Sequence, residues 1–213
     1  MSSNINIVLV NTSHPGNIGS TARAMKTMGL NNLTLVSPKE FPSDIANAKA
    51  VGCIDILENA NVVENFDDSL SRSSLVIGFS ARSRKSNIPS LAMDELISML
   101  NNHTGDEISI VFGNEQSGLS NEELQRCNYI VSIPTDDAYT SLNLASAVQI
   151  FSYEYFKSID MKSKKKTATN FDFASHSTKK HITQTFLNIM IELDILNDKN
   201  KNTARDCCCW TER

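Results

Sequence analysis

The sequence contains no apolar run close to the roughly 18 residues that a membrane-spanning helix needs. Its amino terminus also lacks the basic and then apolar segments that mark a secretory signal peptide. The five cysteines include no Cys-x-x-Cys spacing of the kind that binds zinc. Cys53 and Cys127 stand alone in apolar surroundings and are interpreted as buried, reduced thiols, whereas the run Cys207-Cys208-Cys209 has no explanation. We therefore expect a cytoplasmic protein without a membrane segment or a metal site.

Three common catalytic and nucleotide-binding motifs are also absent. The stretch Asn17-Ile-Gly-Ser could be mistaken for part of a dinucleotide fingerprint, but Gly-x-Gly-x-x-Gly does not occur. The phosphate-binding Gly-Lys-Ser/Thr sequence is missing, and so is the Gly-x-Ser-x-Gly turn of α/β-hydrolases. These absences argue against an NAD-dependent enzyme, a P-loop nucleotidase and a serine hydrolase.

The charged residues are unevenly distributed. The net charge of -4 argues against a uniformly basic surface for nucleic acid. Residues 1–156 carry 9 Lys and Arg against 17 Asp and Glu, whereas residues 157–213 carry 11 against 7. Within the acidic part, five of the nine positive charges fall at two places, Arg23 with Lys26 and the segment 82–85. Such concentration predicts local anion-binding sites.

Short apolar, β-branched runs alternate with helical patterns along residues 5–156. This alternation is typical of an α/β domain with a mostly parallel sheet flanked by helices. The helical pattern after Ser141 is apolar on more than one face, which indicates a second surface to be covered by a dimer partner. We divide the chain into a main domain at 1–157, a basic polar linker at 158–174 and a helical extension with a frayed end at 175–213.

Two loops follow apolar runs and precede helical patterns. The first comes after Phe112 and contains Gly113, Glu115 and Gly118, and the second comes after Ile133. Loops in this position lie at the carboxyl ends of parallel strands, where open α/β sheets bind ligands. The glycines allow turns or close approach of the backbone, and Glu115 is the only charge in its loop.

A third loop follows the expected strand Ile5–Val10 and leads into a helix. We expect Asn17 to be the N-cap of this helix and Gly29 to end it. Arg23 lies early in this helix, which follows a strand and a glycine-containing loop. The start of such a helix is where phosphates commonly bind. His14 could serve as a general base, but a lone loop histidine more often makes a hydrogen bond or lies at the surface.

Three motifs in this order resemble those of the SPOUT superfamily of S-adenosylmethionine-dependent RNA methyltransferases. The matching stretches are Asn17 to Arg23, Phe112 to Leu119, and Ile133-Pro-Thr with Ser141-Leu-Asn-Leu-Ala. Further stretches are similar to the TrmJ-type tRNA 2′-O-ribose methyltransferases, namely Ser13-His14, Ala24 to Gly29, Ser80 to Arg84, and Tyr139 before Ser141. The resemblance covers residues 5 to about 156, which is nearly the whole main domain.

The resemblance implies a SPOUT-type parallel sheet with a deep C-terminal trefoil knot, a homodimer, and S-adenosyl-L-methionine as the cofactor. It places the adenosyl part of the cofactor at Phe79, Ser80, Ala81, Gly113, Ile133, Ser141, Leu142 and Asn143. It gives Asn17, Glu115 and Gly118 the task of organising the loops around that site. No metal is implied.

The resemblance also makes Arg23 and Ser141 the catalytic residues. Arginine is a poor base because its proton is held tightly, so Arg23 could either remove the ribose proton or orient an RNA phosphate. Contacts with RNA are expected from Arg23, Lys26, Arg82, Arg84 and Lys85.

The implied reaction is 2′-O-ribose methylation of tRNA, at the pyrimidine at position 32 of the anticodon loop. A loop nucleotide suits an enzyme that must reach one exposed ribose. Two alternatives remain, the same chemistry on ribosomal RNA and a non-catalytic knotted RNA-binding factor. The sequence departs from the family pattern at Asn114 and Gln116, where arginines are frequent, and it leaves open the choice between cytidine and uridine.

Overall fold

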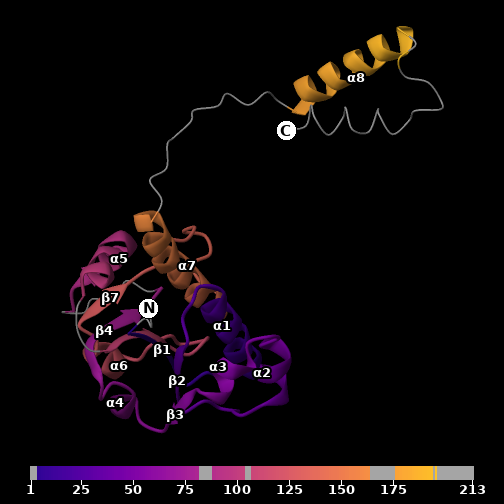
Figure 1. Cartoon of the computed structure of the whole chain (residues 1–213). Coiled ribbons are helices and arrows are strands. Elements are labelled where there is room, and N and C mark those ends of the chain that lie inside the picture. The colour runs from indigo at the N-terminus through magenta and orange to yellow at the C-terminus, as the bar shows by residue number, and fades with distance from the viewer. Residues whose placement is uncertain (1–3, 82–87, 104–106, 164–175, 194, 196–213) are drawn as a thin grey trace. The chain divides into compact units, whose positions relative to one another are not determined.

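The structure is a computed structural model that describes residues 4–81, 88–103, 107–163, 176–193 and 195. The chain forms two compact units, Met1–Lys165 and Lys166–Arg213. The first unit holds one sheet and its covering helices (Figure 1). The second unit contains a single described helix, α8 (His176–Glu192), which lies within the segment predicted as a helical extension.

The sheet has seven strands in the order β3-β2-β1-β6-β4-β7-β5, and every pair of neighbouring strands is parallel. The strands are β1 (Ile5–Val10), β2 (Asn32–Val36), β3 (Asn61–Val63), β4 (Ser73–Phe79), β5 (Ser90–Leu91), β6 (Glu107–Phe112) and β7 (Tyr129–Val131). This confirms the predicted α/β class with a parallel sheet. All carboxyl ends of the strands therefore meet at one edge, which is where the loops selected from the sequence lie.

Strand β1 shows how both faces of the sheet are covered. All six of its residues are buried, as expected for a central parallel strand. Ile7 and Leu9 belong to one hydrophobic cluster, whereas Val8 and Val10 belong to the other, because alternate side chains point to opposite faces.

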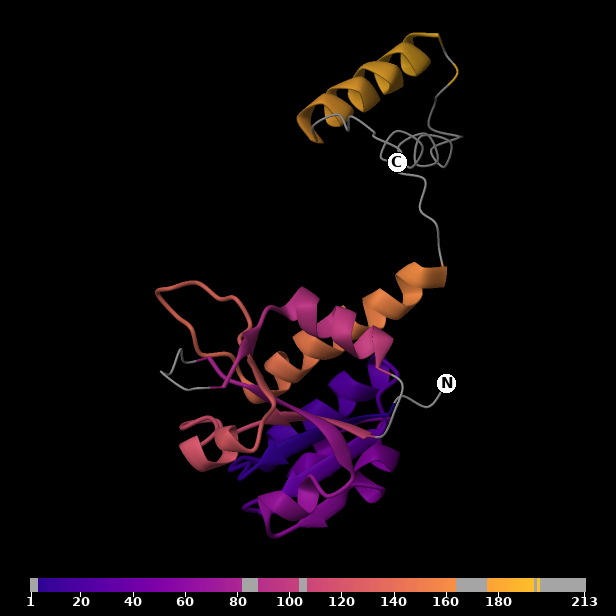
Figure 2. The ribbon, with the colours of Figure 1, turned by 90° about the vertical axis from the view of Figure 1, so that its left-hand side faces the viewer.

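The helices of the first unit form a layer on each face of the sheet. They are α1 (Pro15–Thr27), α2 (Asp44–Lys49), α3 (Ile54–Glu58), α4 (Phe66–Ser69), α5 (Met93–Asn102), α6 (Asn121–Gln125) and α7 (Leu144–Ser163). The larger cluster includes side chains of α1, α2, α3, α5 and α7, and the smaller one is covered by α4 and α6. Helices α5 and α7 lie side by side on their face of the sheet (Figure 2).

Helix α1 buries the face that the sequence predicts and begins earlier than predicted. Ile18, Ala22 and Met25 are fully buried, whereas Arg23 and Lys26 are exposed. The prediction of Asn17 as the N-cap is wrong, because the helix begins at Pro15 with His14 as its N-cap. Proline fits the first helical turn, where its missing N–H has no intrahelical partner to lose.

Helix α7 differs from its predicted bounds at both ends. It begins at Leu144, two residues later than the predicted start, and it runs to Ser163 rather than ending near Phe156. Residues 158–163, predicted as the start of a linker, therefore continue the helix. The division of the chain at 157 and 174 stays a prediction.

Cys53 and Cys127 are buried and free, which confirms their interpretation as reduced core thiols. Burial, together with the nearby Glu123 carboxylate, raises the pKa of the Cys127 thiol to about 12. The thiol therefore stays neutral and unreactive at ordinary pH. Cys207 to Cys209 lie outside the described residues.

Two features are absent from the described part of the chain. None of its helices combines the length and the apolar character needed to cross a membrane. No group of three or more of its His, Cys, Asp and Glu side chains is arranged to hold a metal ion.

Candidate active site

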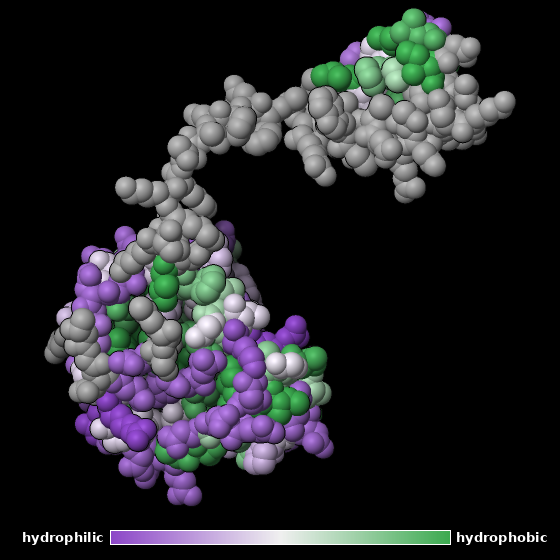
Figure 3. All heavy atoms as spheres, viewed as in Figure 1, coloured by the Kyte–Doolittle hydropathy of each residue, from purple (hydrophilic) through white to green (hydrophobic). Residues whose placement is uncertain are grey.

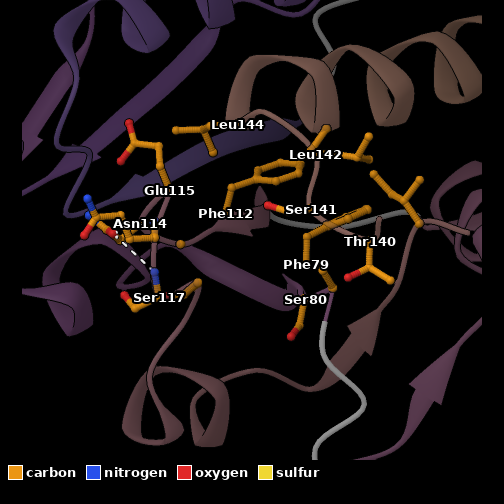
Figure 4. Close-up of a pocket in the computed structure, with 16 residues that line it drawn as sticks. Phe79, Ser80, Phe112, Asn114, Glu115, Ser117, Thr140, Ser141, Leu142 and Leu144 are labelled. Atoms are coloured by element: carbon orange, nitrogen blue, oxygen red, sulfur yellow. Dashed lines mark hydrogen bonds between the residues drawn. The ribbon is translucent and has the colours of Figure 1, made fainter. Parts of the chain in front are cut away.

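A pocket of about 250 Å³ opens at the carboxyl edge of the sheet. It lies between the ends of β4 and β6, the loop after β6 and the segment that leads into α7 (Figure 4). Its lining consists of Phe79, Ser80, Ala81, Phe112, Gly113, Asn114, Glu115, Gln116, Ser117, Gly118, Ile133, Thr140, Ser141, Leu142, Leu144 and Ala147. Asn114 and Glu115 lie on one side of the pocket, and Thr140 and Ser141 lie on the other.

Aromatic rings form the apolar wall of the pocket. The rings of Phe79 and Phe112 are stacked with their centroids 4.7 Å apart, and Phe151 meets Phe79 edge-on at 5.6 Å. Phe79 and Phe112 are paired in register at the ends of β4 and β6, so the sheet fixes both rings. A rigid apolar wall beside loop backbone is typical of sites for small organic ligands.

The backbone at Gly113 leaves no room for a side chain. A Cβ at this position would lie 2.3 Å from the carbonyl carbon of Gly118 and 2.3 Å from the nitrogen of Leu119. The intervening loop folds back on itself through a hydrogen bond of 2.8 Å from Gly118 N–H to the Asn114 carbonyl. Gly118 has a φ of +67°, a conformation that L side chains rarely adopt.

The loop is held at both of its ends. The side chain of Asn114 donates from Nδ2 to the Asn11 carbonyl at 2.6 Å, and its Oδ1 accepts from the backbone of Gln116 at 2.9 Å. A capping box starts α6, where the side chains of Ser120 and Glu123 accept from each other's backbone N–H. The loop is thus held both by local contacts and by a contact with the loop that leads into α1.

Glu115 reaches from this loop to the start of α1. Its Oε2 accepts from both the backbone N–H of Ser13 (2.9 Å) and the Ser13 hydroxyl (2.8 Å). Its Oε1 accepts from the backbone N–H of His14 (3.3 Å) and from Nδ2 of Asn17 (2.8 Å). We call Glu115 with Ser13, His14 and Asn17 the carboxylate clamp.

These hydrogen bonds keep Glu115 ionised. Partial burial alone would raise the pKa of its carboxyl group, but the hydrogen bonds from Asn17 and Ser13 outweigh burial and hold the pKa below its usual value. A lowered pKa means that the clamp contributes stability above the ordinary glutamate pKa and that this contribution disappears as the pH falls through the lowered value.

Asn143 links the clamp to the third loop of the site. Its Nδ2 donates to Oδ1 of Asn17 at 3.0 Å, and its Oδ1 accepts from the backbone of Ala145 and Ser146 in the first turn of α7. Asn143 therefore acts as the N-cap of α7. Asn17 in turn contacts both Glu115 and Asn143, so loops far apart in the sequence meet at one side chain.

His14 caps α1 by accepting a hydrogen bond at Nδ1 from the Gly16 backbone at 3.3 Å. This supports the interpretation of His14 as a hydrogen-bonding residue rather than a general base, because its Nδ1 already accepts the hydrogen bond from Gly16.

The structure gathers most of the predicted cofactor residues in one place. All of them except Asn143 line the pocket, and Asn143 contacts the clamp instead. The predicted loop-organising residues Glu115 and Gly118 line the same pocket. Thr140, Leu144 and Ala147 also line the pocket, although the sequence did not predict them as site residues. The hydrogen bond from Ser13 to Glu115 was not predicted either. Ser13 carries no sequence signal for this role, because its partner lies 102 residues away.

The predicted RNA-contacting residues are placed only in part. Arg23 projects from α1 as an exposed side chain. Lys26 forms an ion pair of 2.5 Å with Asp55 of α3, and both side chains are largely exposed. Arg82, Arg84 and Lys85 lie outside the described residues.

The comparison with protein families gives a match over most of the first unit. The model of the SpoU rRNA Methylase family matches residues 4–153. This match agrees with the resemblance inferred from the three motifs and spans β1 to the middle of α7.

Two relatives are about half identical to the chain. One is the tRNA (cytidine/uridine/adenosine-2′-O-)-methyltransferase TrmJ of Pseudomonas aeruginosa, 51% identical over 152 residues that cover 70% of this chain and 59% of that protein. The other is the tRNA (cytidine/uridine-2′-O-)-methyltransferase TrmJ of Sodalis glossinidius, 52% identical over 152 residues that cover 71% and 60%. The chain thus spans about 60% of the length of these curated relatives.

Solved structures show the same fold. A probable methylase family protein from Haemophilus influenzae superimposes with a TM-score of 0.73 at 41% identity, covering 97% of this chain and 86% of that one. TrmJ from Z. mobilis superimposes with a TM-score of 0.69, covering 97% and 89%, but its 24% identity shows likeness of fold alone.

Proposed function

Because the chain belongs to the SpoU rRNA Methylase family, we propose that it is an S-adenosylmethionine-dependent RNA 2′-O-ribose methyltransferase. One observation carries the proposal. The pocket combines a glycine-lined backbone with an aromatic wall, and the carboxylate clamp joins it to the helix that carries an exposed arginine, Arg23. The proposed activity belongs in the cytoplasm, where tRNA is available.

The pocket residues suit the adenosyl part of S-adenosyl-L-methionine. Gly113 allows the flat base to approach the backbone, because no side chain fits there. Phe79 and Phe112 offer apolar contact, and the exposed Ser141 and Leu142 also line the pocket. When bound, this cofactor would supply an electrophilic methyl group on a sulfonium sulfur.

The residues of the chain would then position the ribose rather than activate it strongly. Methyl transfer needs the 2′-oxygen in line with the methyl group, and correct placement contributes much of the rate. Arg23 would bind the RNA phosphate beside that oxygen, because a guanidinium fork matches phosphate geometry and is a poor base. Ser141 would hold the reacting groups from the other side of the pocket. Lys26 would contact RNA after leaving Asp55, at small cost because solvent screens an exposed ion pair.

For the substrate, we propose tRNA, and within it the pyrimidine at position 32 of the anticodon loop. The two relatives that are about half identical carry tRNA methyltransferase names, whereas the family description refers to rRNA. Ribosomal RNA is therefore the second candidate. Arg82, Arg84 and Lys85 would extend the RNA-binding surface.

A methyl-acceptance assay separates these candidates. Purified protein is incubated with labelled S-adenosyl-L-methionine and, in parallel, with unmodified tRNA or unmodified ribosomal RNA at equal nucleotide concentration. We expect label in the tRNA fraction alone. Label in ribosomal RNA alone would replace the proposed substrate, and label in neither RNA would leave only RNA binding.

We also propose that the first unit forms a homodimer through α7. Tyr153, Phe156 and Ile159 of this helix are between 43% and 50% exposed, although they are large and apolar. Apolar atoms also reach the surface over α2 and α3, at Ile45 and Ile54 (Figure 3). Exposed apolar groups of this kind are typical of protein interfaces.

Analytical ultracentrifugation tests the dimer. The wild-type chain is expected to sediment with twice the mass of the 23.5 kDa chain, and Tyr153→Asp with Phe156→Asp is expected to shift it to the monomer. Ile182→Asp in α8, another exposed apolar position, serves as the control and should leave the mass unchanged. A wild-type monomer at micromolar concentration would contradict the proposal.

A further inference from the structure

The carboxylate clamp holds the start of α1 from two directions. Ser13 and His14 precede the helix and Asn17 lies in its first turn, and all three donate to the single carboxylate of Glu115. Hydrogen bonds to a charged acceptor are stronger than those between neutral groups. The clamp therefore fixes both the entry of the chain into α1 and the rotation of its first turn.

The other end of the same network is part of the pocket. Glu115 lines the pocket, and Asn17 accepts from Asn143, which directly follows the lining residues Ser141 and Leu142. A ligand that orders either wall of the pocket would thus act on a side chain that also holds α1.

Arg23 follows Asn17 by six residues on the same helix. A helix rises about 1.5 Å per residue and moves as a rigid rod, so a tilt or rotation at its first turn is transmitted to Arg23. Misplacement of a reacting group by about 1 Å can cost about a hundredfold in rate. The position of Arg23 therefore depends on how firmly the first turn is held.

We propose that the carboxylate clamp couples the pocket to Arg23, and that Ser13 is a positioning residue for the methyl transfer, an inference that rests on the proposed function. Ser13 is suited to testing this role, because it is absent from the pocket lining and its hydroxyl donates to Glu115. Its hydroxyl is one of four donors to that carboxylate, and its removal leaves the backbone donor in place.

The kinetic test compares Ser13→Ala with Ser13→Thr. The alanine variant is expected to lower kcat about tenfold while the cofactor Kd stays within about twofold of wild type, because the pocket lining is unchanged. Threonine retains the hydroxyl and should restore most of kcat. Ser43→Ala is the matched control, since Ser43 also donates to a carboxylate at 2.8 Å, that of Glu40, which does not line the pocket.

Each outcome of the kinetic test decides for or against the role of Ser13. An unchanged kcat in Ser13→Ala would overturn it, and so would an equal loss in Ser13→Thr. A similar loss in Ser43→Ala would indicate a general effect of stability. A parallel fall in cofactor affinity and kcat would make Ser13 part of the pocket instead.

Amide hydrogen exchange tests the coupling without any need for activity. In the wild-type chain, S-adenosyl-L-methionine alone should slow exchange in residues 16–23 of α1, and in Ser13→Ala this slowing should be at least halved. Cofactor binding without slower exchange in α1 would overturn the coupling. A wild-type chain that shows the slowing but methylates no RNA would refute the proposed function and leave the coupling intact.

Discussion

Arg23→Ala is expected to reduce methyl transfer by at least about a hundredfold while leaving the cofactor Kd within about twofold of wild type. The large loss follows because a charged group that stabilises the transition state typically contributes about 10²–10³ in kcat. The cofactor should still bind, since Arg23 is exposed and contacts no pocket residue among those described. Calorimetry measures the cofactor affinity, and transfer of a labelled methyl group measures the activity.

Two further variants sharpen the test of Arg23. Arg72→Ala removes another exposed arginine, which precedes β4 at the opposite edge of the sheet from the pocket, and should leave both quantities unchanged. Arg23→Lys keeps the charge but loses the planar fork, so partial activity with weaker RNA binding would identify phosphate orientation as the role. Loss of cofactor binding in Arg23→Ala would contradict the assigned role.

Gly113→Ala is expected to weaken cofactor binding by about ten- to a hundredfold. The added methyl group would lie 2.3 Å from backbone atoms of Gly118 and Leu119, which are not free to rotate away as a flexible side chain could. Overpacking of this kind typically costs about 1–3 kcal/mol, and here the loop that must move is a wall of the pocket. Calorimetric titration with S-adenosyl-L-methionine gives the affinity directly.

Gly29→Ala is the matched control for Gly113→Ala. Gly29 ends α1 with a φ of +74°, and a Cβ there would meet nothing within 4 Å. The substitution should therefore destabilise the chain by about 1 kcal/mol through backbone strain and leave cofactor affinity unchanged. An unchanged cofactor affinity in Gly113→Ala would show that the loop can move to accommodate the methyl group. Cofactor binding would then not require glycine at position 113.

The sequence predicted the sheet and the pocket because both depend on local patterns. Buried runs such as Ile7–Val10 and Leu75–Phe79 carry no polar side chain, and the loops after Phe112 and Ile133 follow such runs directly. In a parallel sheet these loops must share one edge, so their proximity follows from the class of fold. The seven-stranded order, by contrast, has no local signal and was first seen in the structure.

Contacts between distant residues were not predictable in this way. Asn17 has the chemistry of an N-cap, but the proline at position 15 and the nitrogen of His14 start the helix earlier and free Asn17 to bond Glu115 and Asn143. The pairing of Ser13 with Glu115 joins loops about a hundred residues apart, which no periodicity reports. The trefoil knot stays a prediction, because it depends on how one segment of the chain passes through a loop of another. The dimer also stays a prediction, because it depends on a second copy of the chain.

The most direct test of the account is to map the methylated atom. Unmodified tRNA is incubated with the purified protein and S-adenosyl-L-methionine, digested with a nuclease, and analysed by mass spectrometry for 2′-O-methylated nucleosides and their positions. We expect a 2′-O-methylpyrimidine at position 32 that is absent when Arg23→Ala replaces the wild type. A methyl group on a base, or equal 2′-O-methylation by Arg23→Ala, would contradict it.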